Sequence, residues 1–314
     1  MTRSRSRALV AALAVTLAGQ AGIRADREPV APATAMAAAP GTERFQYVIG
    51  ARVRPLLVFW ITRDDVGDAV VTRRRAADEA DYSLLIGTDP QRTPMHVNRW
   101  GYIEEEIRGA RARLLGVMTE SDEESIEQAE AGVRTQAVGS HPFKIIHATT
   151  DGEQAHARVA SIHASQDYTL RQVPIVLDLA GRDPNQGRER VAQMPPGTRP
   201  GFLAALVDAM HASAPRSITY VYYGRLYELR RLRSKAIPDL RIAQRSFGPA
   251  VAADFVVTSA YDGEQTKFSM TYGTQGRFAE VPLTVTYQPR WWMQLELTIA
   301  AAPEPAAIES KARQ

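Results

Sequence analysis

The sequence predicts an α+β fold, built mainly of antiparallel β-hairpins with two or three helices packed against them. Apolar and polar residues alternate over many short segments, which is the period of a half-buried strand. Two Asp-Gly dipeptides, at 151–152 and 262–263, are favoured residues for hairpin turns. Helical signals are fewer. With 45% hydrophobic and 23% charged residues in a chain of 314, the composition excludes a wholly disordered chain, a collagen-like repeat and a polytopic membrane protein.

The N-terminus has the pattern of a secretory signal peptide, which we expect to span residues 1–25. Three arginines form a basic head, residues 8–19 form a short apolar stretch, and small residues follow. The apolar stretch is shorter than the ~20 residues that a membrane-spanning helix needs. A retained N-terminal anchor is the alternative. We therefore expect an exported protein, periplasmic or extracellular after cleavage, with no transmembrane segment in the mature chain.

The basic charge of the chain belongs largely to this N-terminal segment. Residues 1–25 carry four arginines and no acidic residue, so their removal lowers the formal net charge from +3 to −1. A nucleic-acid partner is therefore not expected, and nothing in the sequence indicates a cofactor. The absence of cysteine excludes disulfides, thiolate metal sites, a cysteine nucleophile and a lipidated cysteine.

A disordered linker at 26–44, rich in Ala and Pro, precedes an N-terminal α+β region at 45–180. Ser121 and Glu124 have the spacing of a capping box, which predicts a helix to about residue 133. The turn residues at 63–67 should break the chain between two strands. Strands are expected where apolar residues alternate or run together, at 45–53, 56–61, 69–72, 82–86 and 114–118.

A loop rich in Gly, Pro and Arg at 181–201 precedes a region of helix plus C-terminal β structure at 202–300 and a tail at 301–314. This region is either a second domain or part of one continuous sheet. Its strands are expected at 283–287 and 291–299. Five apolar residues at helical spacing predict a helix that begins near Pro200 and ends before Pro215; they are Phe202, Leu203, Leu206, Val207 and Met210.

The Asp-Gly turns set the expected register of two hairpins. A two-residue turn at 262–263 pairs Val257 with Phe268 and Phe255 with Met270, so that all four share one face.

A two-residue turn at 151–152 places His147 directly opposite His156, with Cβ atoms ~4.5–5.5 Å apart. The two imidazoles could then share a metal ion with ligands from elsewhere. A histidine pair that is exposed or lies at the edge of the core is the alternative.

The candidate ligand-binding residues are arginines close to aromatic side chains. Arg230, Arg231 and Arg233 lie in a segment with seven basic residues, 225–245, next to several tyrosines. Cationic and aromatic groups together suit an anionic ligand. The turn at 98–102 adds Arg99 and Trp100 as a second candidate surface. The alternative is a solvated basic face, because alternation along a strand sends Arg230 and Arg231 to opposite faces.

No common catalytic motif is present, and no catalytic residue can be assigned. The chain lacks a Gly-x-Ser-x-Gly elbow, a His-Glu-x-x-His motif, a Ser-x-x-Lys motif and a dinucleotide-binding fingerprint. A hydrolase would need Asp64, Asp65 or a histidine to lie beside a serine or a second carboxylate. The consecutive glutamates at 104–106 predict the exposed face of a helix.

Five segments resemble a family of uncharacterised exported bacterial proteins. They are WITRDDVG (60–67), LIGTDP (85–90), NRWGY (98–102), YGTQG (272–276) and YQPRWW (287–292). The resemblance implies an exported location. It implies no activity and no site residue.

These observations favour a non-enzymatic envelope or periplasmic protein that binds a ligand or an envelope partner, with an anionic ligand fitting the arginine segment. One alternative is a periplasmic hydrolase that acts on a glycan or an ester. The other is a structural or assembly protein of the cell envelope. A concave pocket would favour a binding protein or an enzyme, whereas an exposed apolar patch or strand edge would favour an assembly protein.

Overall fold

The computed structural model describes residues 41–53, 60–93, 97–119, 140–165, 168–182, 185–290 and 293–300. Fourteen strands form one antiparallel sheet, and β11 and β12 form a separate small hairpin. The strands are β1 (Glu43–Val53), β2 (Ile61–Arg75), β3 (Glu79–Thr88), β4 (Trp100–Arg108), β5 (Arg111–Thr119), β6 (Ser140–Thr150), β7 (Gln154–Ser165), β8 (Arg188–Gln193), β9 (Ser217–Tyr222), β10 (Arg225–Ile237), β11 (Arg241–Ile242), β12 (Arg245–Ser246), β13 (Ala250–Ser259), β14 (Gln265–Gly273), β15 (Pro282–Arg290) and β16 (Met293–Ile299).

The first and last strands, β1 and β16, lie next to each other in the middle of the sheet. The chain proceeds strand by strand from β1 to β8 at one edge, crosses to β9 at the other edge, and comes back through β10, β13, β14 and β15 to β16. β16 then pairs with β1, with Tyr47 opposite Ile299. Because the first and last strands pair, β1–β8 and the strands β9, β10 and β13–β16 belong to a single sheet.

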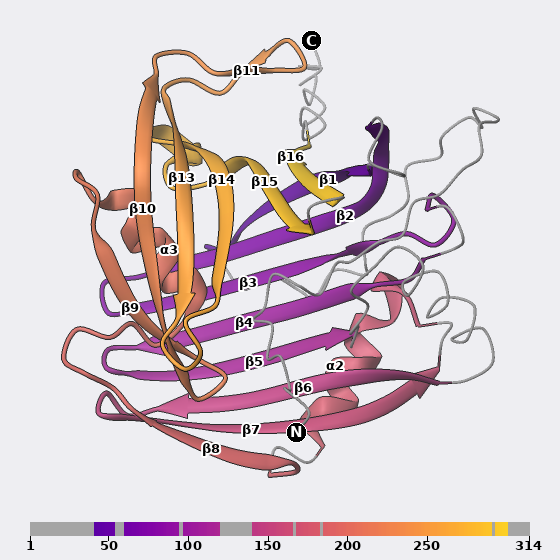
Figure 1. The fold of residues 1–314 in the computed structure, drawn as a ribbon, viewed down its shortest axis with the longest axis vertical. Coiled ribbons are helices and arrows are strands. Elements are labelled where there is room, and N and C mark those ends of the chain that lie inside the picture. Colours follow the sequence, from indigo (N-terminus) through magenta and orange to yellow (C-terminus); the bar gives the residue numbers. More distant parts are fainter. Residues whose placement is uncertain are drawn as a thin grey trace, which may run out of the picture.

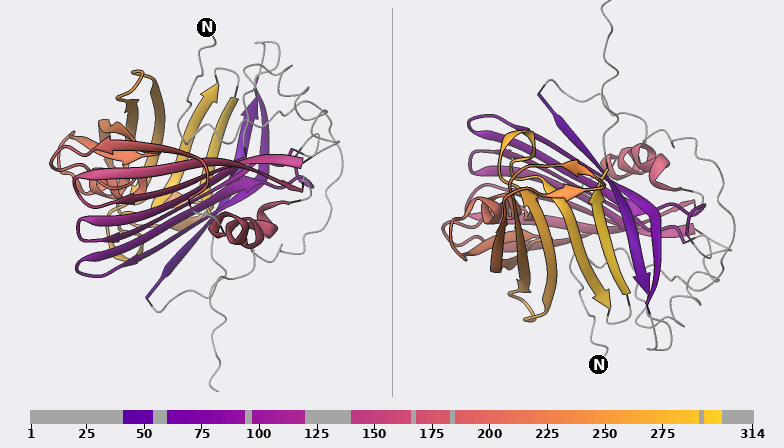
Figure 2. Two further views of the ribbon diagram at one scale, coloured as in Figure 1. Left: turned by 90° about the horizontal axis from the view of Figure 1, so that it is seen from below. Right: turned by 90° about the horizontal axis from the view of Figure 1, so that it is seen from above.

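The sheet is strongly curved, so that β9, β10, β13 and β14 cross over β3–β7 at a steep angle (Figures 1 and 2). Its two edges approach each other: Arg199, just after β8, forms a bridge to Tyr220 of β9, and its carbonyl oxygen accepts a hydrogen bond from the Val221 N–H at 2.9 Å. Alternate residues of every strand therefore point into the concave side, which we call the inner face.

Two short α-helices lie on opposite faces of the sheet. Helix α3 (Phe202–His211) lies on the inner face, between the crossing layers, and α2 (Val173–Gly181) lies outside β1–β8 (Figures 1 and 2). The 3₁₀ helices η4 (Leu170–Gln172) and η5 (Gly276–Phe278) are single turns. The larger core fills the inner face, and a smaller one lies beneath α2.

The prediction of antiparallel β structure is confirmed, but the α+β class does not match well. The described residues are dominated by strands, and their two α-helices are short, so the fold is better called mainly β. The helix predicted between Pro200 and Pro215 is present as α3. The predictions at 1–25, 121–133 and 301–314 lie outside the described residues, as do most of the linker predicted at 26–44 and of the strand predicted at 56–61. The linker prediction is wrong at its end, because β1 begins at Glu43, and Ile61 is the first residue of β2.

Two segments expected to be irregular are part of the sheet. The break expected at 63–67 is a bulge inside β2, where Asp65 adopts a left-handed conformation (φ 61°) and the strand continues. The loop expected at 181–201 contains β8, an edge strand of mostly polar residues. The side chains of β8 are exposed or only half-buried, so its sequence lacks the apolar alternation that marks strands.

Both Asp-Gly hairpins have longer turns than predicted. Thr258 pairs with Gln265, so Phe255 lies opposite Phe268, two residues from the predicted register. The predicted face is still correct, since a shift of two residues preserves it. Phe255 and Phe268 stack with ring centroids 5.1 Å apart on the inner face.

The segment 98–102, expected to form a turn with an exposed binding surface, is buried. Trp100 is 0% exposed and Arg99 is 2% exposed. The Trp100 ring lies 4.8 Å from that of Phe143, and its Nε1–H donates a hydrogen bond to the carbonyl oxygen of Tyr168 at 3.2 Å. The segment that leads into α2 covers this side of the sheet, so Arg99 and Trp100 do not form an accessible binding surface.

Truncating Trp100 should destabilise the protein far more than truncating the exposed Trp60. Trp100→Ala empties a fully buried site and is expected to lower the free energy of unfolding by about 3–5 kcal/mol. Trp60, 41% exposed, is the matched control, for which Trp60→Ala should lower the free energy of unfolding by only about 1 kcal/mol. Urea denaturation measures both. Equal effects would contradict the packing of Trp100 beneath α2.

Candidate functional site

A hollow lies between α3 and the inner face of the sheet. The predicted apolar stripe of α3 (Phe202, Leu203, Leu206, Val207 and Met210) faces this cavity, which has a volume of about 190 Å³. Strands β1–β5 and β14–β16 complete the lining, almost entirely with apolar side chains.

Several side chains on the inner face are left incompletely packed by the cavity. Val71, Leu84, Ile86, Val285 and Leu297 all point inward, yet each is only half-buried. Inner residues beyond the cavity, such as Leu229 and Phe255, are fully buried. The cavity therefore presents apolar surface that a ligand could cover.

The N-terminus of α3 is held by a glutamate from the sheet. Glu105 on β4 is 0% exposed, and its carboxylate accepts hydrogen bonds from the backbone N–H groups of Leu203 at 2.8 Å and Ala204 at 3.0 Å. A side chain at Gly201 would overlap this carboxylate. The prediction that residues 104–106 form an exposed helical face is thus wrong, because on a strand the middle glutamate points inward.

Burial and the helix terminus act on Glu105 in opposite directions. Burial raises the pKa of the Glu105 carboxyl to about 7, and the amide groups of Leu203, Ala204 and Phe202 oppose that rise. The positive end of the helix dipole favours the ionised form as well. Glu105 thus changes its protonation state near neutral pH while it remains bonded to α3.

The C-terminus of α3 is held by Arg231 of β10, which is 4% exposed. Its Nη2 donates to the carbonyl oxygen of Ala212 at 2.5 Å, and its Nη1 donates to the Ala209 carbonyl oxygen at 3.3 Å and to the Tyr272 hydroxyl at 3.0 Å. Arg231 therefore caps the carbonyl end of the helix from inside the sheet.

The three predicted arginines do not form one surface. Arg231 points inward, whereas Arg230 is exposed on the opposite face and Arg233 is exposed and paired with Asp254. A bulge lies between Arg231 and Arg233 in the pairing with β13. The arginine segment is thus divided between a helix cap and a solvated face.

One end of the cavity is charged, and we call it the charged end. It consists of Arg73 and Arg75 of β2, His211 at the end of α3, and Glu280. Glu280 lines the cavity, pairs with Arg75, and contacts Nε2 of His211 through Oε1 at 2.7 Å. Arg73 donates to Glu43 and to the carbonyl oxygens of Ala279 and Arg277, at 2.6, 2.6 and 3.2 Å respectively.

The histidine pair is not assembled as predicted. The turn after β6 is longer than two residues, so His147 pairs with Arg158 and His156 pairs with Thr149. Nε2 of His147 lies 2.9 Å from the carbonyl oxygen of Ala180 in α2. No group of three or more His, Cys, Asp or Glu side chains in the described part of the chain is placed to hold a metal ion.

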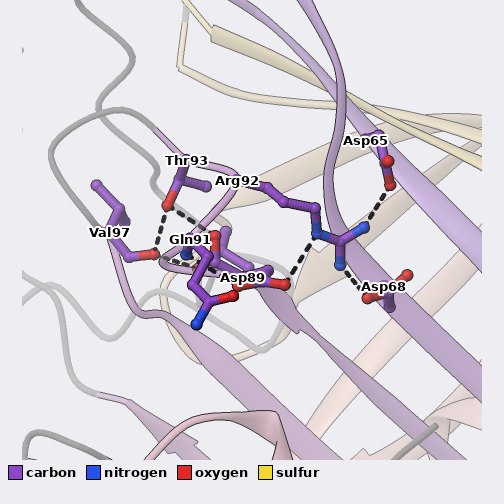
Figure 3. A network of polar contacts seen from close by, with 8 residues as sticks. Asp65, Asp68, Asp89, Gln91, Arg92, Thr93 and Val97 are labelled. Carbon is purple, nitrogen blue, oxygen red and sulfur yellow. Dashed lines mark hydrogen bonds and ion pairs between the residues drawn. The ribbon is translucent and has the colours of Figure 1, made fainter. Parts of the chain in front are cut away.

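Of the two carboxylates suggested for a hydrolase, Asp64 and Asp65, the second is bound by an arginine. Asp65 pairs with the guanidinium of Arg92, as do Asp68 and Asp89, the last at 3.0 Å (Figure 3). The cluster joins the bulge of β2 to the loop after β3. These ion pairs hold the two segments together, which suits a structural role.

Comparisons with protein-family models, curated proteins and solved structures find no match for this chain. None of the helices in the described ranges is both long and apolar enough to cross a membrane.

The sequence does contain a signal for the two helix caps. Glu105 lies between Ile103 and Ile107, and Arg231 follows Leu229, so each charge falls in the apolar phase of an alternating strand. A charged residue in that phase must be paired when it is buried. The partner, a helix end, cannot be read from the strand itself.

Removing the cap at the C-terminus of α3 should destabilise the protein. Arg231→Met leaves two helix carbonyls and a tyrosine hydroxyl without their donor, at a cost of about 3 kcal/mol in the free energy of unfolding. Arg233→Met, two residues along the same strand and exposed, is the control and should leave stability nearly unchanged. Chemical denaturation of both variants tests this. A stable Arg231→Met variant would show that α3 is held by its apolar contacts alone.

Stability should also depend on pH through Glu105. Between pH 4.5 and 7 the unfolded chain ionises this group while the folded chain retains the proton, so the free energy of unfolding falls as pH rises. The shift corresponds to about 3 kcal/mol across that window. Unfolding of the wild type and of Glu105→Gln should be measured at several pH values. As pH rises, the wild type should lose stability relative to Glu105→Gln. If the two proteins have parallel curves of unfolding free energy against pH, the raised pKa is contradicted.

Proposed function

We propose that this chain is an exported protein that binds a small apolar molecule in the cavity beneath α3, without transforming it. The observation that carries the proposal is the cavity itself. It is lined almost entirely by apolar side chains and lies between the inner face and a helix fixed at both ends. Apolar surface of this kind is favourable to cover, and sites for small ligands are mostly apolar with a few polar groups.

The size of the cavity supports a small ligand. An engineered apolar cavity of about 150 Å³ stays dry and binds benzene, and the cavity here is about 190 Å³. The half-buried inner residues would gain contacts on binding. Export follows from the expected signal peptide at 1–25 and remains part of the proposal.

Filling the cavity should abolish binding of an apolar probe. Val207 on α3 lines the cavity, and Val207→Phe places a ring where the ligand would lie. We expect 1-octanol to bind the wild type with a negative heat-capacity change, the marker of apolar burial. Val207→Phe should weaken it by at least about tenfold, or 1.4 kcal/mol. Isothermal titration calorimetry at several temperatures measures both quantities.

The matched control is Ile175→Phe, which makes a similar change at an exposed position of α2. It should bind 1-octanol as the wild type does, and circular dichroism should show that both variants are folded. Failure of the wild type to bind 1-octanol, or equal binding by Val207→Phe, would contradict the proposal.

A further inference from the structure

The charged side chains that line the cavity lie close to one another. Arg73 and Arg75 are two residues apart on β2, and Tyr82 of β3 lies directly opposite Arg73. Arg73, Tyr82 and Glu280 line the cavity, and Arg75 pairs with Glu280. A ligand in the apolar part could place a polar group beside these side chains.

Arg75 retains donors that a ligand could use. It contacts Glu280 through Nη1, so its Nε and Nη2 have no partner in the ranges that the structure describes, and its side chain is 34% exposed. Arg73 differs because all three of its nitrogens donate to Glu43, Ala279 or Arg277. Of the two arginines, Arg75 is the one that can donate a hydrogen bond to a further acceptor.

Tyr82 offers a second donor beside Arg75. Its hydroxyl has no hydrogen-bond partner among the described residues, although the side chain lines the cavity. Burial raises the pKa of Tyr82, so the hydroxyl keeps its proton at neutral pH. A neutral phenol can donate to an anion.

The groups left available at this end are hydrogen-bond donors, and one of them is cationic. Arg73 pairs with Glu43 and Arg75 pairs with Glu280, which leaves the other nitrogens of Arg75 and the Tyr82 hydroxyl to bind an acceptor; Arg277 lies over the ring of Phe278, 4.7 Å from its centroid. Glu280 adopts a left-handed backbone conformation (φ 57°), which is strained for a glutamate. That conformation sets a carboxylate between Arg75 and His211.

We infer that the cavity takes an amphiphile with a carboxylate head, whose head accepts hydrogen bonds from Arg75 and Tyr82 and whose chain lies along α3. This inference rests on the proposed function. At a ~30 Å³ share for each water-sized group, the cavity holds roughly six methylene-sized groups, which is a medium-length chain. Charge-assisted bonds to an arginine are among the stronger polar contacts, so the head contributes affinity as well as orientation.

Three probes with the same chain and different heads test this inference: octanoate, 1-octanol and octylammonium. Titration calorimetry with the purified full-length protein should show octanoate binding about tenfold or more tighter than 1-octanol, as a hydrogen bond to a charged group predicts. Octylammonium should bind most weakly. Arg75→Met should reduce octanoate to the affinity of 1-octanol and leave 1-octanol unchanged.

Two further variants keep the test decisive. Tyr82→Phe removes one hydroxyl and should weaken the binding of octanoate about threefold, because a neutral hydrogen bond contributes less than a charge-assisted one. The binding of 1-octanol should not change. Arg52→Met is the matched control, since Arg52 also pairs with a glutamate across two strands, Glu296, but on the outer face. It should change none of the three affinities.

The outcomes separate this inference from the proposed function. If octanoate and 1-octanol bind equally well, or octylammonium binds most tightly, the carboxylate head is wrong and the apolar site stands. If Arg75→Met and Tyr82→Phe leave the preference for octanoate intact, the head lies elsewhere and the assignment fails. If none of the three probes binds, both this inference and the proposed function fail.

Discussion

The position of α3 depends on two charged side chains that lie inside the sheet. A helix end leaves backbone N–H or C=O groups without intrahelical partners, and an apolar interior offers them no water. Glu105 supplies acceptors at the N-terminus and Arg231 supplies donors at the C-terminus. Each charge also has the sign that its end of the helix dipole favours. With both ends satisfied, a ten-residue helix can stay inside the curved sheet rather than on its surface.

The cavity follows from this arrangement. The sheet is curved enough to bring β8 close to β9, and one short helix cannot fill the space that the curvature encloses. Glu105 and Arg231 hold α3 at its two ends, and the cavity lies between the helix and strands that include β2 and β3. Arg73 has a comparable role at the charged end, where its bonds to the backbone of residues 277 and 279 hold that segment against β2. Void volume thus remains where packing would otherwise be most favourable.

Local patterns in the sequence predict the parts of this structure that local interactions determine. The strands at 45–53 and 82–86, the helix at 202–211 and the inward face of Phe255 and Phe268 all follow from apolar period. Hairpin register does not follow from an Asp-Gly pair alone. The Asp151 carboxylate accepts hydrogen bonds from the N–H groups of Glu153 and Gln154, which widens the turn and moves His147 away from His156.

The site itself is set by contacts between residues far apart in the chain. Glu105 bonds to a residue 98 positions away, and nothing near Glu105 in the sequence identifies that partner. The position of Glu105 in the alternation of β4 does predict that its carboxyl group is buried and needs a hydrogen-bond partner. The local sequence therefore shows that a partner is needed, but not which residue it is. The cavity is still harder to predict from the sequence, because it is the volume that remains after all these partners are placed. Only the folded arrangement, in which β1–β5, β14–β16 and α3 face one another, reveals it.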